Sequence, residues 1–246
     1  MANELHYGLC LIVYGDSKVG KSTLAATAPK PVLILDAEGG SRFLPGRKIK
    51  WDPISEKPPK ADGTWDICIV SVREYKTIDM AFQWLNSGAH EFQSVVVDSI
   101  SEAQQRCIDA LVGKNQMQTQ DWGTLLRNVS ELIRSFRDLT THPVKPLDAV
   151  VFIAMMKLGD AGEYRPFMQG QIATTFPYFV DLCAYLGYAA LEDGSMVRRL
   201  YTSQILGHRT VGERLGGCLG PYVDNANLSE MLETVRLFAS GGEIAQ

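Results

Sequence analysis

Residues 15–23 form a short motif whose residue types and spacing could bind phosphate. They read GDSKVGKST, directly after the apolar segment at 9–14. The glycines let backbone N–H groups surround phosphate oxygens, the lysine places a cation on the β- and γ-phosphates, and the next hydroxyl can bind Mg²⁺. The motif therefore predicts a site for a nucleoside triphosphate, with ATP and Mg²⁺ as ligands. The residues expected to bind nucleotide are Gly15, Asp16, Ser17, Lys18, Val19, Gly20, Lys21, Ser22 and Thr23.

A magnesium ion at such a site needs a carboxylate at the end of a neighbouring strand. Asp98 ends the apolar segment SVVVD at 94–98, so we expect Ser22 and Asp98 to hold the metal. An aspartate that caps a following helix would occupy the same place in the sequence. The pattern favours the metal site because the phosphate-binding motif already implies one.

Hydrolysis of a triphosphate also needs a group that orients and deprotonates water. Many motor ATPases have a glutamate directly after the magnesium aspartate, but this chain has Ser99 there. The candidate base is instead Glu38, which follows the apolar segment at 31–36, with Asp36 supporting it. Glu102 is an alternative base. The competing interpretation of Glu38 is a solvated acid in a loop.

The elements that must position these residues alternate between apolar strands and amphipathic helices. Continuous apolar strands are typical of a parallel sheet covered by helices on both faces. We therefore predict an α/β fold with a mostly parallel sheet flanked by helices. The expected strands are 9–14, 31–36, 66–72, 94–98 and 149–155. The expected helices are 21–28, 73–85, 101–112 and 121–141, the last with an apolar face of Leu125, Val129, Leu132, Ile133 and Phe136.

The C-terminal part of the chain has a different pattern. Residues 182–203 alternate around the turn EDGS, which predicts an antiparallel hairpin that extends the sheet. A closing helix is expected at 227–239, with Asn227 as its cap. Residues 39–65 are rich in Gly, Pro and Lys, so we expect a surface excursion there. Residues 1–246 then form a single domain, with 182–246 supplying the hairpin and the closing helix.

Composition and charge exclude several classes of protein. The net charge is −4, so a uniformly basic nucleic-acid coat is excluded and any DNA contact needs a local patch. The five cysteines are dispersed without a CxxC pair, which indicates reduced thiols and neither disulfides nor a zinc site. The sequence has no apolar run of membrane-spanning length and no signal pattern, which predicts a cytoplasmic protein without membrane contact.

Three motifs in this order resemble those of the RecA-like recombinase ATPases. They are the phosphate loop, LDAEGG at 35–40 and VVVDSIS at 95–101. The resemblance runs from about residue 9 to 155, and the tail resembles that of core-only bacteriophage RecA-like single-strand annealing or recombination proteins. It implies a RecA-like P-loop NTPase core, DNA-stimulated ATP hydrolysis with Glu38 as base, and a homo-oligomeric ring or filament. The implied partners are single-stranded DNA and a single-strand-binding protein, in the host cytoplasm if the chain is phage-encoded.

The resemblance also implies an arginine that reaches the γ-phosphate held by a neighbouring subunit. Arg214 is the candidate, and it would act in catalysis beside Glu38 and Lys21, with Arg209 as a substitute. The family usually has a lysine two residues before this arginine, whereas Gly212 stands here. A surface ion pair is the competing interpretation of Arg214.

Two loops of RecA-like proteins contact DNA, and the matching segments here are 113–122 and 157–171. The second combines cations with aromatic rings, which suits phosphate contact and base stacking. Its DNA-binding candidates are Lys157, Tyr164, Arg165 and Phe167. The first segment offers Lys114, Gln116 and Trp122, although Trp122 is more readily a core anchor. The basic segment at 46–50 is either an outer DNA surface or a solvated charge run.

One departure from the resemblance leaves other functions open. The family usually has a polar residue that senses the γ-phosphate at the end of the fifth strand, where this chain has Met155 and Met156. A nonpolar residue there favours a nucleotide-dependent assembly switch that does not hydrolyse ATP. A hexameric DNA translocase or helicase motor would use the same core. A small-molecule kinase would need an arginine-rich lid, and the sequence has no convincing one.

Overall fold

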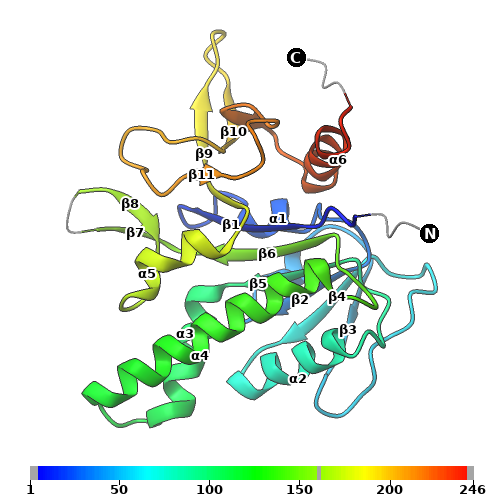
Figure 1. The fold of residues 1–246 in the computed structure, drawn as a ribbon, viewed down its shortest axis with the longest axis vertical. Coiled ribbons are helices and arrows are strands. Elements are labelled where there is room, and N and C mark those ends of the chain that lie inside the picture. The colour runs from blue at the N-terminus through cyan, green and yellow to red at the C-terminus, as the bar shows by residue number, and fades with distance from the viewer. Residues whose placement is uncertain (1–4, 160–161, 243–246) are drawn as a thin grey trace.

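The computed structural model describes residues 5–159 and 162–242. Within those residues, the main sheet has ten strands with helices on both faces (Figure 1). Its strands are β1 (Leu9–Gly15), β2 (Val32–Asp36), β3 (Lys48–Lys50), β4 (Ile67–Ser71), β5 (Ser94–Asp98), β6 (Ala149–Ala154), β9 (Leu182–Ala190), β10 (Met196–Tyr201), β11 (Gly212–Glu213) and β12 (Tyr222–Asp224). A separate two-stranded sheet pairs β7 (Met156–Leu158) with β8 (Tyr164–Pro166).

The strand order confirms the predicted α/β fold. The path β12-β10-β9-β1-β6-β5-β2-β4-β3 is parallel from β9 to β3 and antiparallel at β10 and β12. The predicted hairpin is the β9–β10 pair, and it extends the sheet beside β1. The carboxyl ends of β1, β2 and β5 therefore lie at one edge, which is where ligands bind in such sheets.

The helices divide into two layers (Figure 1). They are α1 (Lys21–Ala25), α2 (Tyr75–Asn86), α3 (Ile100–Val112), α4 (Thr119–Asp138), α5 (Ile172–Thr175) and α6 (Leu228–Ala239). Alternate side chains of β1 enter different cores, because Ile12 and Tyr14 pack with α2 to α4 whereas Leu11 and Val13 pack with α1 and α6. Burial on both faces explains why β1 is apolar at consecutive positions.

Two helices show how far the sequence pattern extends. In α4 the five residues predicted for the apolar face are all buried, which confirms the 3.6-residue periodicity. Helix α1 ends at Ala25, three residues before the predicted end. Pro29 disfavours helical backbone at the preceding residue. In addition, Thr27 accepts a hydrogen bond from the Leu228 amide at 2.8 Å, which fixes the chain after α1 against α6.

Residues 39–65, expected as a surface excursion, also contribute to the sheet and the core. Strand β3 pairs parallel with β4 at the sheet edge, with Lys48 and Lys50 exposed. Trp51 and Trp65 are buried, and each ring packs on Phe92, with centroids 5.8 and 6.0 Å apart. The two tryptophans therefore anchor a segment whose Gly, Pro and Lys content suggested only a loop.

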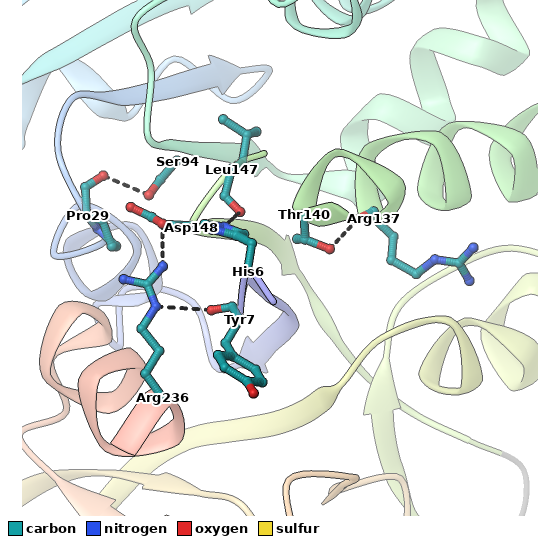
Figure 2. A network of polar contacts seen from close by, with 9 residues as sticks. All are labelled: His6, Tyr7, Pro29, Ser94, Arg137, Thr140, Leu147, Asp148 and Arg236. Carbon is teal, nitrogen blue, oxygen red and sulfur yellow. Dashed lines mark hydrogen bonds and ion pairs between the residues drawn. The ribbon is translucent and has the colours of Figure 1, made fainter. Parts of the chain in front are cut away.

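The closing helix α6 is fixed to the amino ends of the strands, whereas the predicted site lies at their carboxyl ends (Figure 2). Asn227 caps α6 by accepting a hydrogen bond from the Ser229 amide at 3.0 Å. Arg236 pairs with Asp148, which precedes β6, and donates to the Tyr7 carbonyl at 3.1 Å. These contacts tie α6 to the amino ends of β1 and β6. In the described part of the chain, no helix combines the length and apolarity needed to cross a bilayer.

Candidate nucleotide-binding site

The phosphate-binding motif connects β1 to α1, as the sequence predicts. Gly20 has φ +103°, a left-handed conformation that side chains rarely adopt. At Gly15, a Cβ would lie 2.2 Å from the Leu186 carbonyl oxygen of β9. Glycine is therefore required at both places, by backbone conformation at one and by close approach at the other.

The side chain of Lys21 lies over the loop. Its Nζ donates hydrogen bonds to the carbonyls of Gly15 at 2.9 Å and Asp16 at 2.8 Å. Burial lowers the pKa of this ammonium group, while the carboxylates of Glu38 and Asp98 act in the opposite direction. The loop's own carbonyls thus hold a cation at the position where a phosphate-binding lysine is needed.

Ser22 and Asp98 meet across the site. The Ser22 hydroxyl donates to Oδ2 of Asp98 at 2.6 Å, joining the start of α1 to the end of β5. Burial raises the pKa of Asp98 to about 6, with Glu38 and Asp36 adding to the rise and Ser22 and Lys21 opposing it. A hydroxyl and a carboxylate are hard oxygen donors of the kind Mg²⁺ accepts with phosphate and water. The residues present therefore fit a magnesium ion.

Glu38 is oriented by a residue that the sequence analysis did not assign. Its Oε1 accepts a hydrogen bond from the Ser99 hydroxyl at 2.5 Å. Asp36 accepts hydrogen bonds from the amides of Gly39 at 2.7 Å and Ser41 at 3.0 Å, so it closes the turn that carries Glu38. Ser99 stands where many motor ATPases have their glutamate, and in this chain it positions Glu38.

The alternative base, Glu102, is engaged elsewhere. It forms an ion pair with Arg106 at 2.8 Å, one turn along α3, and it does not line the cavity. Ser99, which precedes α3, caps this helix by accepting a hydrogen bond from the Glu102 amide at 3.3 Å. The geometry therefore favours Glu38 over Glu102.

These groups surround one cavity of about 540 Å³. Eight of the nine predicted loop residues line it, together with Glu38 and Asp98. Val19 is the exception because its side chain is buried in the core with α1 and α6, so only its backbone can face a ligand. The predicted role of Val19 in nucleotide binding therefore depends on its backbone N–H, as expected for a phosphate-binding loop.

Apolar residues line the rest of the cavity. Met155 and Met156 lie there, after β6, where the RecA-like family usually has a polar sensor. Phe43 also lines the cavity, and its side chain is 77% exposed. Phe43 could not be identified from the sequence because it follows no strand and belongs to no phosphate-binding motif. An exposed ring beside a nucleotide cavity can stack on a base.

The two candidate arginines lie outside this cavity. Arg214 is half exposed, donates to the Val180 carbonyl at 3.1 Å and pairs with Asp181 at 3.2 Å. It lines a second cavity of about 470 Å³ beside the exposed Tyr178. Arg209 is 79% exposed and pairs with Glu163 at 2.6 Å. Neither arginine lines the nucleotide cavity of its own chain.

The four DNA-binding candidates lie in or beside a short hairpin. Lys157 of β7 faces Arg165 of β8 in register, and its ammonium lies 5.1 Å from the Phe167 ring centre. The Tyr164 ring stacks on His208 with centroids 5.3 Å apart. Residues 156–158 and 164–166 are therefore paired strands, where the sequence suggested only a loop. In the other segment, Trp122 lies within α4 and is 41% exposed, so the expectation of a core anchor is wrong.

The parallel sheet, the loop between β1 and α1, and the carboxylates at neighbouring strand ends define a P-loop ATPase. The family described as "AAA domain" matches residues 8–211, and the chain belongs to that family.

The comparison with solved structures includes a prototypical ATPase from the type III secretion system of pathogenic bacteria, at 15% identity and a TM-score of 0.47. The similarity covers 74% of this chain and 52% of that one, so it spans about half of the other protein. No curated protein matches the chain.

Proposed function

We propose that this chain hydrolyses ATP with Mg²⁺ and uses the nucleotide to control an oligomer that binds single-stranded DNA. One observation carries the hydrolytic part of the proposal. Lys21, the Ser22–Asp98 pair and Glu38 come from three separate segments and converge on one cavity. A cation, a magnesium site and a candidate base around one space are the parts that phosphoryl transfer to water requires.

In this mechanism, the Lys21 ammonium leaves the carbonyls of Gly15 and Asp16 for the β- and γ-phosphate oxygens. Ser22 and Asp98 would hold Mg²⁺, which when bound would neutralise charge on those phosphates. Glu38 takes a proton from water as the water oxygen bonds to the γ-phosphorus, and the bond to the β–γ bridging oxygen breaks. The products are ADP and inorganic phosphate. Ser99 keeps the Glu38 carboxylate directed at the water through its hydrogen bond.

The oligomeric part of the proposal concerns Arg214. Its guanidinium is half exposed and is held by Val180 and Asp181 away from the cavity of its own chain. A role in catalysis therefore requires a second copy of the chain, whose γ-phosphate it would contact. An arginine supplied in this way stabilises charge in the transition state and links hydrolysis to assembly.

The DNA-binding part of the proposal concerns the β7–β8 hairpin. Lys157 and Arg165 are cross-strand neighbours, and like charges in that position repel each other. A phosphate backbone would relieve this repulsion, and the exposed ring of Tyr164 would offer a surface for base stacking. The hairpin follows directly from β6, so it starts at the edge of the nucleotide cavity.

The decisive experiment measures phosphate release with and without single-stranded DNA, together with the mass of the nucleotide-bound assembly. We expect turnover that DNA stimulates, a mass above that of the monomer, and a loss of roughly 100-fold or more in Lys21→Ala. Lys30→Ala is the matched control because Lys30 is exposed outside the cavity. Turnover that is equal in Lys21→Ala and wild type would overturn the proposal.

A second candidate function has one observation in its favour. Met155 and Met156 line the cavity where a polar group would otherwise contact the γ-phosphate. A site of this kind could bind ATP, assemble and release nucleotide with negligible hydrolysis. Assembly that depends on ATP, with no phosphate release under any DNA condition, would favour this switch over the ATPase.

A further inference from the structure

An arginine from the β9–β10 hairpin lies against the phosphate-binding loop. A Cβ built on Gly20 would lie 2.5 Å from Nη1 of Arg198 and 3.5 Å from its Cδ. The guanidinium and part of its stem therefore occupy the space beside the residue that precedes Lys21. Arg198 belongs to no phosphate-binding motif, and it is 178 residues away from Gly20 in the sequence.

The strand register explains how Arg198 reaches the loop. Gly15 at the end of β1 pairs in register with Leu186 of β9, and Leu186 pairs in turn with Leu200 of β10. Arg198 lies two residues beyond Leu200, so it passes the end of β1 on the side where the loop begins. Leu200 is buried with α1 and α6, and alternation along β10 directs Arg198 to the same face.

The sheet order also places Arg198 relative to Glu38. Strand β1 lies between β9 and β6, and the carboxylates of Glu38 and Asp98 follow β2 and β5, beyond β6. Arg198 comes from the opposite side, where β9 and β10 lie. A polyphosphate lying along the loop with its γ-phosphate at Glu38 would therefore have its other end nearer to Arg198.

Arg198 has no ion-pair partner within the described residues. Its guanidinium forms no ion pair and donates no hydrogen bond to any of them, although the residue is half-buried. Arg199, its neighbour in β10, pairs with Asp224 at 2.6 Å and lies 3.8 Å from the Tyr222 ring centre. A half-buried cation without a carboxylate partner, packed on a phosphate loop, is suited to an anion.

We propose that Arg198 binds the α- and β-phosphates of the nucleotide, as a ligand from the same chain as the loop. The proposal rests on the nucleotide site described above and adds a binding residue to it. ADP and ATP share these phosphates, so Arg198 contributes to the affinity for both. It does not act on the γ-phosphate, and turnover at saturating ATP does not depend on it.

The expected effect of Arg198→Gln is a loss of roughly 10- to 100-fold in affinity for both ADP and ATP, the range for one charged hydrogen bond. The KM for ATP rises by a similar factor and kcat stays within about twofold. Arg198→Lys keeps the charge but loses the planar fork, so it recovers part of the affinity.

The experiment measures ADP and ATP binding to the full chain by calorimetry, with steady-state turnover and the nucleotide-free melting temperature for each variant. Arg199→Gln is the matched control because it removes the adjacent arginine of the same strand without touching the loop. An unchanged ADP affinity in a folded Arg198→Gln protein would overturn the proposal, as would a fall in kcat at unchanged affinity. If Arg198→Gln does not fold, Arg198→Lys decides between these outcomes.

The binding measurement also separates this proposal from the proposed hydrolysis. If wild type binds ADP but releases no phosphate, hydrolysis fails while Arg198 is still tested by ADP affinity. If wild type binds neither nucleotide, both proposals fail. If Lys21→Ala abolishes binding and Arg198→Gln does not weaken it, only the role of Arg198 fails.

Discussion

The hydroxyl of Tyr14 lies 3.1 Å from Nδ1 of His208, and both residues are buried. Tyr14 is the last residue of β1 before Gly15, and the His208 ring stacks on Tyr185 with centroids 3.8 Å apart. The same imidazole stacks on Tyr164 of the β7–β8 hairpin. A continuous set of contacts therefore joins the start of the phosphate-binding loop to the proposed DNA-binding hairpin.

Replacing His208 should weaken communication between these two places. We expect His208→Ala to bind ATP as wild type does, because His208 neither lines the nucleotide cavity nor, unlike Arg198, packs against Gly20. Stimulation of turnover by single-stranded DNA should fall severalfold, since Tyr164 loses the ring that supports it. Tyr222→Ala is the control because Tyr222 packs on Tyr201, farther from the hairpin. Equal stimulation in His208→Ala and wild type would contradict this coupling.

The hydrogen bond between Ser99 and Glu38 makes a graded prediction about turnover. Glu38→Gln should lower kcat by roughly 100- to 10,000-fold while ATP binding persists, because the amide cannot accept the proton of water. Ser99→Ala should lower kcat less, since the carboxylate remains but loses the hydroxyl that orients it. Turnover and ATP binding are measured on each variant.

Glu102→Gln is the matched control for Glu38→Gln. Its carboxylate pairs with Arg106 outside the cavity, so its removal should leave kcat nearly unchanged. A larger loss of turnover in Glu102→Gln than in Glu38→Gln would show that Glu102, and not Glu38, is the base.

The proposed DNA contact makes a prediction about salt dependence. The double variant Lys157→Ala/Arg165→Ala should bind single-stranded DNA more weakly and with a salt slope about 1.4 smaller, the value for two phosphate contacts on a single strand. ATP binding should be unchanged because neither residue lines the cavity. The double variant Lys48→Ala/Lys50→Ala removes two exposed lysines of β3 as a control. If that control reduces the slope instead, the basic segment at 46–50 is the DNA surface.

The parts of the site that the sequence predicted depend on local patterns. The phosphate loop is recognised by its glycines and lysine between a strand and a helix. Asp98 is recognised by its position at the end of an apolar strand. The face of α4 follows from its 3.6-residue repeat. Each of these signals needs only neighbouring residues, so a single sequence contains it.

The parts that were missed or corrected depend on tertiary placement. Arg198 reaches Gly20 only because β9 pairs with β1 in one register, which no local pattern encodes. Phe43 lines the cavity from a turn that Asp36 closes. The exposure of Trp122 likewise follows from where α4 begins, since its apolar face starts three residues later, at Leu125.

His90 makes the fold of this protein sensitive to acid. It lies between α2 and β5, its side chain is 8% exposed, and its ring stacks on Phe92 with centroids 5.9 Å apart. Burial lowers the pKa of His90 to about 4, and the nearby charges of Lys145 and His142 add to this. The folded protein therefore keeps the imidazole neutral over a pH range in which an unfolded chain would protonate it.

The sign of the pH dependence follows from that difference. Below about pH 6.5 the unfolded chain binds a proton at this histidine and the folded chain does not, so stability falls as pH decreases toward 4. Between pH 7.5 and 5.0 the loss from His90 is about 2 kcal/mol. Urea denaturation of wild type and His90→Gln at both pH values isolates the contribution of His90 to this loss of stability. We expect the stability of His90→Gln to fall by about 2 kcal/mol less than that of wild type, and an equal fall would show that His90 is protonated in the folded state.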